Sequence, residues 1–123
     1  MSKVLIIEDS PTTRAVIKVY LVGHHLDFLE AQNGNEGLDI ARRDRPDVIV
    51  VDLKMPGMDG FTFCRAIRRD ARLKETPVIL LTGAKGEEVR REALLSGATY
   101  FMTKPIDGAA LAEKIVTCLE RKK

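Results

Sequence analysis

The fold is decided by one stretch, Asp47-Val48-Ile49-Val50-Val51-Asp52-Leu53-Lys54-Met55-Pro56-Gly57-Met58-Asp59-Gly60. Its four apolar residues, 48–51, are all β-branched, which is typical of a strand buried on both faces. The run stops at an acid, Asp52, and a Pro-Gly turn follows. A carboxylate at the rim of an apolar sheet is costly unless it has a partner, and ligands bind at the carboxyl ends of strands in open parallel sheets. Asp52 is therefore the first candidate functional residue.

The rest of the chain alternates short apolar runs with helical patterns. We expect five strands, near residues 4–7, 26–31, 48–51, 78–81 and 100–102. The second is the most polar, which predicts a place near the sheet edge. We expect five helices, near 12–22, from the turn at 33–35 to 45, after Gly60, near 87–96 and near 108–119. This alternation predicts an α/β fold with three layers, a doubly wound parallel sheet of five strands covered by helices on both faces.

Two helix faces carry more specific expectations. In the first helix, the apolar pattern places these residues largely on one side: Ala15, Val16, Val19, Tyr20 and Val22. In the third helix, Arg65, Arg68 and Arg69 are interpreted as a solvated face rather than a basic patch for a partner.

Length and composition set further bounds. The 123 residues predict one domain, 1–123, and the hydrophobic fraction of 45% is that of a soluble globular protein. The net charge of +2 is too small to indicate nucleic-acid binding. The chain shows neither a signal peptide nor an apolar run of membrane-spanning length, which predicts a cytoplasmic protein without membrane insertion. Cys64 and Cys118 lack a C-x-x-C spacing and are interpreted as isolated reduced thiols.

The most informative pattern is the residue type at the end of each buried strand. Glu8 and Asp9 follow the first strand, Asp52 follows the third, Thr82 the fourth and Lys104 the fifth. Taken alone, each could be a helix cap, a turn residue or a surface charge. Because a parallel sheet places the carboxyl ends of its strands along one edge, we expect these side chains to share one pocket.

Three carboxylates, a hydroxyl and an ammonium in one pocket indicate a particular chemistry. Clustered carboxylates raise one another's pKa unless a cation lies among them, and an open site of oxygen ligands suits Mg²⁺ better than Ca²⁺. A carboxylate beside Mg²⁺ can act as a nucleophile toward phosphorus and form an aspartyl phosphate. The metal and a fixed lysine would neutralise charge on the phosphoryl group, and the threonine could donate a hydrogen bond to it.

Four motifs at these spacings together resemble the receiver domain of bacterial two-component response regulators, of the stand-alone chemotaxis-regulator type. They are Ile6-Ile7-Glu8-Asp9-Ser10, Asp52-Leu53-Lys54-Met55-Pro56-Gly57-Met58-Asp59-Gly60, Leu81-Thr82-Gly83 and Lys104-Pro105. The resemblance covers essentially the whole chain. It implies a flavodoxin-like sheet with strand order 2-1-3-4-5.

The resemblance also implies a metal site and a phosphoacceptor. Asp52 would take a phosphoryl group from a sensor histidine kinase, a histidine phosphotransfer protein or a small phosphodonor. Asp9 and Asp52 would bind Mg²⁺ directly, with the backbone carbonyl of Lys54 as a third protein ligand. Glu8 would act through a metal-bound water.

The remaining implied roles concern the response to phosphorylation. Lys104 would pair with the phosphoryl group, and its peptide bond to Pro105 would be cis. Thr82 would be the switch hydroxyl and Phe101 the switch aromatic. The family often has tyrosine at this last position; the Phe101 ring can still turn but cannot make a hydroxyl hydrogen bond. The switch would change the partner surface formed by the fourth helix, fifth strand and fifth helix.

In this interpretation the protein is a signalling domain, catalysing its own phosphotransfer and slow autodephosphorylation, and not a general enzyme. Its partners would be the phosphodonor protein and a downstream protein target, with the chain a monomer or a phosphorylation-dependent dimer. Direct nucleic-acid binding is not expected, because there is no helix-turn-helix pattern and the basic residues are scattered.

Two alternatives come from other functional classes. The first is a Mg²⁺-dependent phosphohydrolase with an aspartyl nucleophile, but such enzymes tend to carry a second acid where Lys54 lies here. The second is a nucleotide or flavin carrier on the same fold, which the lack of a G-x-G-x-x-G motif after the first strand disfavours. A degenerate receiver that is not phosphorylated is disfavoured because every required pocket residue is present.

Overall fold

In the computed structural model, which describes residues 1–121, five strands form one parallel sheet in the order β2-β1-β3-β4-β5. The strands are β1 (Ser2–Ile7), β2 (Leu26–Ala31), β3 (Val48–Asp52), β4 (Val78–Thr82) and β5 (Tyr100–Thr103). This order confirms the flavodoxin-like prediction, and β2 lies at a sheet edge as its polarity predicted. The last two residues of the predicted domain 1–123 lie outside the described residues.

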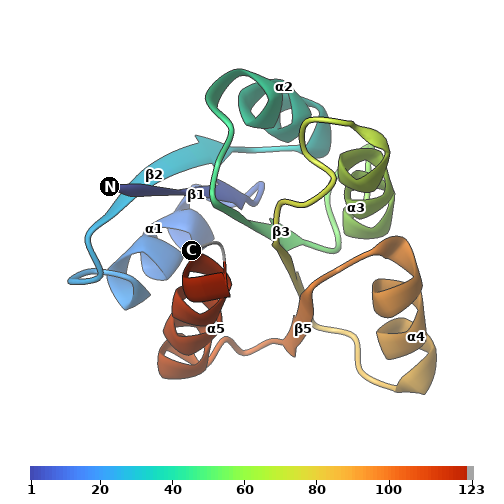
Figure 1. Cartoon of the computed structure of the whole chain (residues 1–123). Helices are drawn as coiled ribbons and strands as arrows, with labels where there is room; N and C mark the ends of the chain where they lie inside the picture. The colour runs from blue at the N-terminus through green and yellow to red at the C-terminus, as the bar shows by residue number, and fades with distance from the viewer. Residues whose placement is uncertain (122–123) are drawn as a thin grey trace.

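Helices cover both faces of the sheet and make three layers (Figure 1). α1 (Pro11–Tyr20) and α5 (Gly108–Arg121) pack on one face. α2 (Gly34–Asp44), α3 (Gly60–Arg69) and α4 (Glu87–Ser96) pack on the other. Among the described residues, no helix combines the length and the apolar character that a membrane span requires.

The central strands divide their side chains between two cores. Leu5 and Ile7 of β1 belong to the core beneath α2, α3 and α4, whereas Val4 and Ile6 belong to the core beneath α1 and α5. This alternation follows from the two-residue period of a strand. All five residues of β3 are buried, as its unbroken apolar run predicted. Cys64 lies in the first core and Cys118 in the second, and both are free thiols.

The helix starts next to the strand ends are fixed by caps. Ser10 precedes α1, and its hydroxyl accepts a hydrogen bond from the Thr13 amide at 3.2 Å, with Pro11 at the first helical position. Asp59 precedes α3, and its carboxylate accepts from the Thr62 amide at 2.8 Å. Both caps satisfy backbone groups that a helix start leaves unpaired. They hold in place the loops that leave β1 and β3.

The predicted inner face of α1 is wrong. The structure buries Ile17 and Leu21, which lie one turn apart and face the sheet. Val19 is 69% exposed, and Val22 lies beyond the helix and is 71% exposed. Val16 and Tyr20 are also exposed, and so is Ala15. Because apolar residues occupy most of the circumference of this helix, their periodicity does not single out one face.

The prediction that the basic side chains of α3 form a solvated face is right for exposed Arg69 and wrong for Arg68. Arg68 is half-buried, and its Nε donates to the Gly97 carbonyl at 2.9 Å. Its Nη1 donates to the Thr76 carbonyl at 2.7 Å. Arg68 therefore joins α3 to the end of α4, 29 residues further along the chain, and to the segment just before β4. Arg65 forms an ion pair across to Glu92 of α4 at 3.3 Å.

Candidate functional site

The carboxylates of Glu8, Asp9 and Asp52 lie together at the carboxyl edge of the sheet. β1 and β3 are neighbours, with Ile7 opposite Val51, so the residues that follow or end these strands meet. One oxygen from each of the three carboxylates lies within 4.8 Å of the others. Glu8 and Asp52 are buried, whereas Asp9 is exposed. The cluster therefore has a buried side and a side open to solvent.

Lys104 brings a positive charge to this cluster from the end of β5. Its Nζ lies 2.7 Å from Oδ1 of Asp52 and 3.7 Å from Oε2 of Glu8. Its backbone amide donates to the Thr82 carbonyl at 2.7 Å, which continues the pairing of β4 with β5 by one residue. The Lys104–Pro105 peptide bond is cis, as the resemblance implied.

The charges of the cluster are unevenly balanced. Burial raises the pKa of Glu8 to about 7, and the neighbouring Asp9 and Asp52 add to this effect. The Ser10 amide and the Lys104 ammonium act in the opposite direction but do not cancel it. Burial alone would lower the pKa of Lys104, yet its hydrogen bond to Asp52 and the surrounding carboxylates raise it overall. The pocket therefore favours further positive charge.

The donor atoms fit a divalent metal ion. All three side chains offer carboxylate oxygens, the ligand type that hard divalent cations prefer. Oε1 of Glu8 accepts from the Ser10 amide at 3.2 Å. Oε2 of Glu8 is buried and has no hydrogen-bond partner in the described part of the chain. A buried carboxylate oxygen in that state gains from a cation or from a water bound to one.

Thr82 ends β4 and is 1% exposed. Its Oγ1 accepts a hydrogen bond from the Ala84 amide at 2.9 Å. Because the oxygen acts as acceptor in this bond, the bond does not use the hydroxyl proton, which can be donated elsewhere. This hydrogen bond links the Thr82 hydroxyl, at the end of β4, to the loop that leads into α4.

Phe101 lies in β5, three residues before Lys104 and opposite Leu80 in register. It is half-buried and packs against the core beneath α2, α3 and α4. Val89 of α4 packs against the same core. The site lysine and the predicted switch aromatic are therefore parts of one short segment that borders α4.

The loop between β3 and α3 is held close to Asp52. The Leu53 amide donates to the Leu81 carbonyl at 2.8 Å, and the Gly60 amide donates to the Leu53 carbonyl at 2.8 Å. A Cβ at Gly60 would lie 2.9 Å from the Leu53 Cα and 3.0 Å from the Asp52 carbonyl oxygen. Glycine is therefore needed here for α3 to begin so close to the phosphoacceptor candidate. Lys54 is exposed on this loop, where it lines a cavity of about 530 Å³ with Leu53, Met55, Pro56, Asp59 and Phe61.

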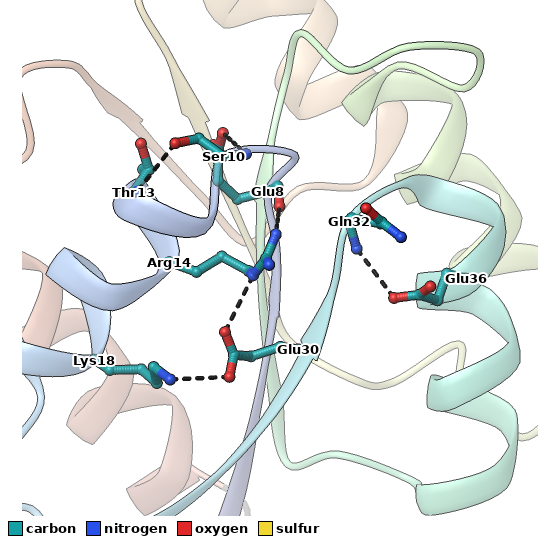
Figure 2. A network of polar contacts seen from close by, with 8 residues as sticks. All are labelled: Glu8, Ser10, Thr13, Arg14, Lys18, Glu30, Gln32 and Glu36. Carbon is teal, nitrogen blue, oxygen red and sulfur yellow. Dashed lines mark hydrogen bonds and ion pairs between the residues drawn. The ribbon is translucent and has the colours of Figure 1, made fainter.

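The sequence reasoning missed Arg14. From the first helix, its Nη1 donates to the backbone carbonyl of Glu8 (Figure 2). Its Nε also donates to Oε1 of Glu30 at 3.1 Å. A basic residue one turn into the helix that follows an acidic pair is the available signal, but surface arginines at such positions are common.

Fold and site together define a class: a doubly wound α/β domain that gathers three carboxylates, a buried threonine and a lysine at its strand ends. The chain belongs to the response regulator receiver domain family, whose family model matches residues 4–116.

Curated relatives and solved structures agree with this assignment. The chain is 36% identical to Protein PilH of Pseudomonas aeruginosa over 115 residues, which cover 94% of the chain and 95% of PilH. It is also 36% identical to Response regulator PleD of Caulobacter vibrioides over 114 residues, which cover 93% of the chain but 25% of PleD. A solved structure described as the signal receiver domain of a signal transduction histidine kinase from Syntrophus aciditrophicus matches with a TM-score of 0.92 and 34% identity. That match covers 100% of this chain and 93% of the other.

Proposed function

We propose that this receiver domain is a phosphorylation-dependent switch of a two-component phosphorelay and that Asp52 is its phosphoacceptor. The observation that carries the proposal is the ammonium of Lys104 at 2.7 Å from Oδ1 of Asp52, within a cluster of three carboxylates. A nucleophilic carboxylate needs cationic neighbours that keep it ionised and that neutralise charge on an incoming phosphoryl group. Membership of the receiver family supports the same role.

In the proposed reaction, a carboxylate oxygen of Asp52 attacks the phosphorus of a phosphohistidine on a sensor kinase or phosphotransfer protein. An O–P bond forms as the P–N bond breaks, and the electron pair of the P–N bond stays on the departing histidine nitrogen. With acetyl phosphate as the donor, a P–O bond breaks instead and acetate leaves. The Lys104 ammonium, which pairs with the Asp52 carboxylate before the reaction, would pair with a phosphoryl oxygen after it.

Mg²⁺ is the proposed cofactor, with Asp9, Asp52 and the backbone carbonyl of Lys54 as direct ligands and Glu8 acting through a bound water. The all-oxygen donor set and the buried Oε2 of Glu8 support this assignment. The bound ion would supply neutralisation of phosphoryl charge. Without it, the carboxylates of the cluster would repel the incoming phosphoryl group.

The proposed conformational response starts from the negative charge that phosphorylation adds to Asp52. Phosphorylation adds about −1.5 to −2 charges and three acceptor oxygens. Thr82 would donate to one of these oxygens, which would move the loop to Gly86, and Phe101 would then turn inward. The partner surface on α4, β5 and α5, including Val89 and Arg90, would change through a shift between two existing states.

Receiver domains interact with histidine kinases and with downstream targets. For this chain we propose both kinds of protein partner, without direct nucleic-acid contact, and a monomer or a phosphorylation-dependent dimer as its state. A cytoplasmic location and a single domain over 1–123 are part of the same proposal. The family assignment favours this role over the phosphohydrolase and the flavin carrier.

Mass spectrometry of the intact protein after treatment with acetyl phosphate tests the chemistry. We expect a gain of one phosphoryl group that requires Mg²⁺ and is lost in Asp52→Ala. Asp59→Asn is the matched control, because Asp59 belongs to the same segment but caps α3. Phosphorylation of the Asp52→Ala protein to the wild-type level would refute the assignment of the phosphoacceptor. Equal binding of a partner by Asp52→Asn and by phosphorylated wild type would refute the switch.

A further inference from the structure

Arg14 of α1 connects the acidic loop after β1 to the neighbouring strand β2 (Figure 2). Its Nη1 donates to the Glu8 carbonyl, and its Nε donates to Oε1 of Glu30 at 3.1 Å. The other oxygen of Glu30, Oε2, accepts from Nζ of Lys18 at 2.9 Å. The Arg14 side chain as a whole is 17% exposed, so most of it is withdrawn from solvent. It is therefore more restricted than an ordinary surface ion pair.

The backbone of Glu8 is held on both sides. Its amide donates to the Ala31 carbonyl of β2 at 3.0 Å, and its carbonyl accepts from Arg14 of α1. The carbonyl of Glu8 and the amide of Asp9 belong to one planar peptide unit. Fixing the direction of this carbonyl therefore fixes the starting point of the Asp9 side chain relative to that of Glu8.

We propose that Arg14 is a positioning residue for the divalent-cation site. Through the Glu8 carbonyl it sets the peptide between Glu8 and Asp9, so that both carboxylates face Asp52. Glu30 orients the Arg14 guanidinium for this task. The inference rests on the proposed function, because it concerns the same cation site, and it adds two residues that do not touch the ion.

A charge comparison separates positioning from simple electrostatics. Arg14 and Lys18 carry the same charge and pair with the same carboxylate, Glu30, but of the two only Arg14 has a hydrogen bond to the Glu8 backbone. Removal of either cation makes the surroundings more negative, which by Coulomb's law favours cation binding. Loss of the positioning by Arg14 should instead weaken cation binding. Arg14→Met and Lys18→Met are therefore a matched pair, and methionine keeps much of the apolar stem in each.

The experiment is a titration of ¹⁵N-labelled protein with MgCl₂, followed by amide chemical shifts. We expect Arg14→Met to bind Mg²⁺ about tenfold more weakly than wild type, at the lower end of the effect of outer partners of metal ligands. We expect Lys18→Met to bind it as tightly as wild type or more tightly. Equal affinities of Arg14→Met and Lys18→Met would overturn the proposal.

The phosphorylation rate with acetyl phosphate gives a second measurement. Arg14→Met should need a higher Mg²⁺ concentration for its half-maximal rate and should approach the wild-type rate at saturation. A lower maximal rate with an unchanged Mg²⁺ requirement would contradict a positioning role. If wild type itself shows no response to MgCl₂, the proposed cation site fails; if wild type responds and Arg14→Met matches it, the role of Arg14 alone fails.

Glu30→Gln keeps the test decisive if Arg14→Met does not fold, which the dispersion of the amide spectrum would reveal. It keeps Arg14 but removes the charge that orients it. Made together with Lys18→Met, so that the net charge near the site is unchanged, it should cause a smaller loss of Mg²⁺ affinity than Arg14→Met. If Arg14→Met does fold, the double variant Arg14→Met/Glu30→Gln should lose less affinity than the sum of the two single losses, because both act through the same hydrogen bond to Glu8. A wild-type Mg²⁺ affinity in Lys18→Met/Glu30→Gln would overturn the orienting role of Glu30.

Discussion

The ammonium of Lys104 lies 2.7 Å from Oδ1 of Asp52, and the same nitrogen lies 3.7 Å from Oε2 of Glu8. One cation is thus shared by two buried carboxylates, with Asp9 beside them. A single positive charge does not balance this cluster, since burial and the neighbouring acids still raise the pKa of Glu8 to about 7. The ammonium stabilises the pocket, and it would be in reach of the phosphoryl group that we propose for Asp52.

Lys104→Met should therefore weaken both the fold and the proposed reaction. We expect a loss of about 2 kcal/mol in the free energy of unfolding at pH 7, less than for a fully buried pair because Lys104 is 33% exposed. MgCl₂ should restore part of this loss. The phosphorylation rate should fall about 100-fold, as when one preorganised electrostatic donor is removed. Urea titrations with and without MgCl₂, together with intact-mass kinetics, would check both effects.

The control for this prediction is Lys54→Met, which removes an exposed lysine from the loop after Asp52 and leaves its backbone carbonyl in place. Its free energy of unfolding should stay within about 0.5 kcal/mol of wild type. If Lys104→Met were as stable as this control at pH 7, the ion pair with Asp52 would have no structural role.

Thr82→Ala should separate phosphorylation from the conformational response. In the proposed switch, the Thr82 hydroxyl acts only once a phosphoryl oxygen is attached to Asp52, so Asp52 should still gain one phosphoryl group. The hydroxyl oxygen accepts a hydrogen bond from the Ala84 amide in the loop before α4. We propose that the hydroxyl turns to the phosphoryl group after phosphorylation. We therefore expect much smaller phosphorylation-dependent shifts of the Val89 and Phe101 amides, measured by NMR. Shifts of wild-type size would show that the signal reaches α4 by another route.

Gly60→Ala should destabilise the loop that follows Asp52. The new Cβ would lie 2.5 Å from Cδ1 of Leu80 and 2.9 Å from the Leu53 Cα. A flexible side-chain end can move, but a backbone atom of the β3–α3 loop cannot move without displacing Asp52. We expect a loss of about 2 kcal/mol in the free energy of unfolding, within the range for overpacking.

Gly83→Ala is the matched comparison for Gly60→Ala, because it adds the same methyl group in the loop after the neighbouring strand. A Cβ at Gly83 would meet no described atom within 4 Å. We expect a change between zero and a gain of about 1 kcal/mol, since alanine lowers the entropy of the unfolded chain. Equal losses from the two substitutions would contradict the close approach at Gly60.

Much of this molecule could be predicted from short-range patterns. Strand β3 is buried on both faces, so its sequence is apolar throughout and its end is marked by Asp52. The parallel topology then brings Glu8, Thr82 and Lys104 to the same edge, which needs no side-chain detail. The sequence could predict which residue types meet there, because the order of the strands follows from alternation and family resemblance.

Other features depend on contacts that no local pattern encodes. The inner face of α1 is decided by Ile17 and Leu21 meeting the sheet, whereas the apolar residues around them are equally compatible with burial. Arg14 and Arg68 look like ordinary basic residues of helix surfaces. Arg68 donates to carbonyls that the tertiary fold places nearby, and Arg14 donates both to the Glu8 carbonyl across the β1–α1 loop and to Glu30 of β2. Polar side chains whose partners come from several elements are therefore the features least accessible to sequence reasoning.

Arg68→Met should cost about 2–3 kcal/mol in the free energy of unfolding, although it replaces a residue that its sequence pattern assigned to a solvated face. It would remove the donors to the carbonyls of Gly97 and Thr76, which are then left without these hydrogen bonds in partly buried surroundings. Arg69→Met, one position along, removes an exposed arginine and should change stability by less than about 0.5 kcal/mol. Urea titrations of both variants would check this. Similar stabilities would show that Arg68 does not join α3 to α4.

The burial of the Cys64 thiol predicts that the free energy of unfolding depends on pH in the alkaline range. Burial raises the pKa of its thiol from an ordinary value of 9.0 to about 11. Above pH 9 the unfolded chain therefore releases this proton while the folded chain retains it. The sign follows: because the unfolded state binds fewer protons there, the free energy of unfolding falls as the pH rises from 9 to 11. Between pH 8 and pH 10 this single group should contribute a loss of about 1 kcal/mol.

Cys64→Ala isolates that contribution, because it removes the thiol and keeps the other groups that titrate at alkaline pH. Alanine leaves a small cavity in the core, so wild type should be the more stable protein at pH 8. The advantage of wild type should narrow by about 1 kcal/mol at pH 10, since wild type alone loses the contribution of the buried thiol. Urea titrations of both proteins at the two pH values measure this difference. An advantage that stayed constant or grew would mean that the Cys64 thiol ionises in the folded protein as readily as in the unfolded chain.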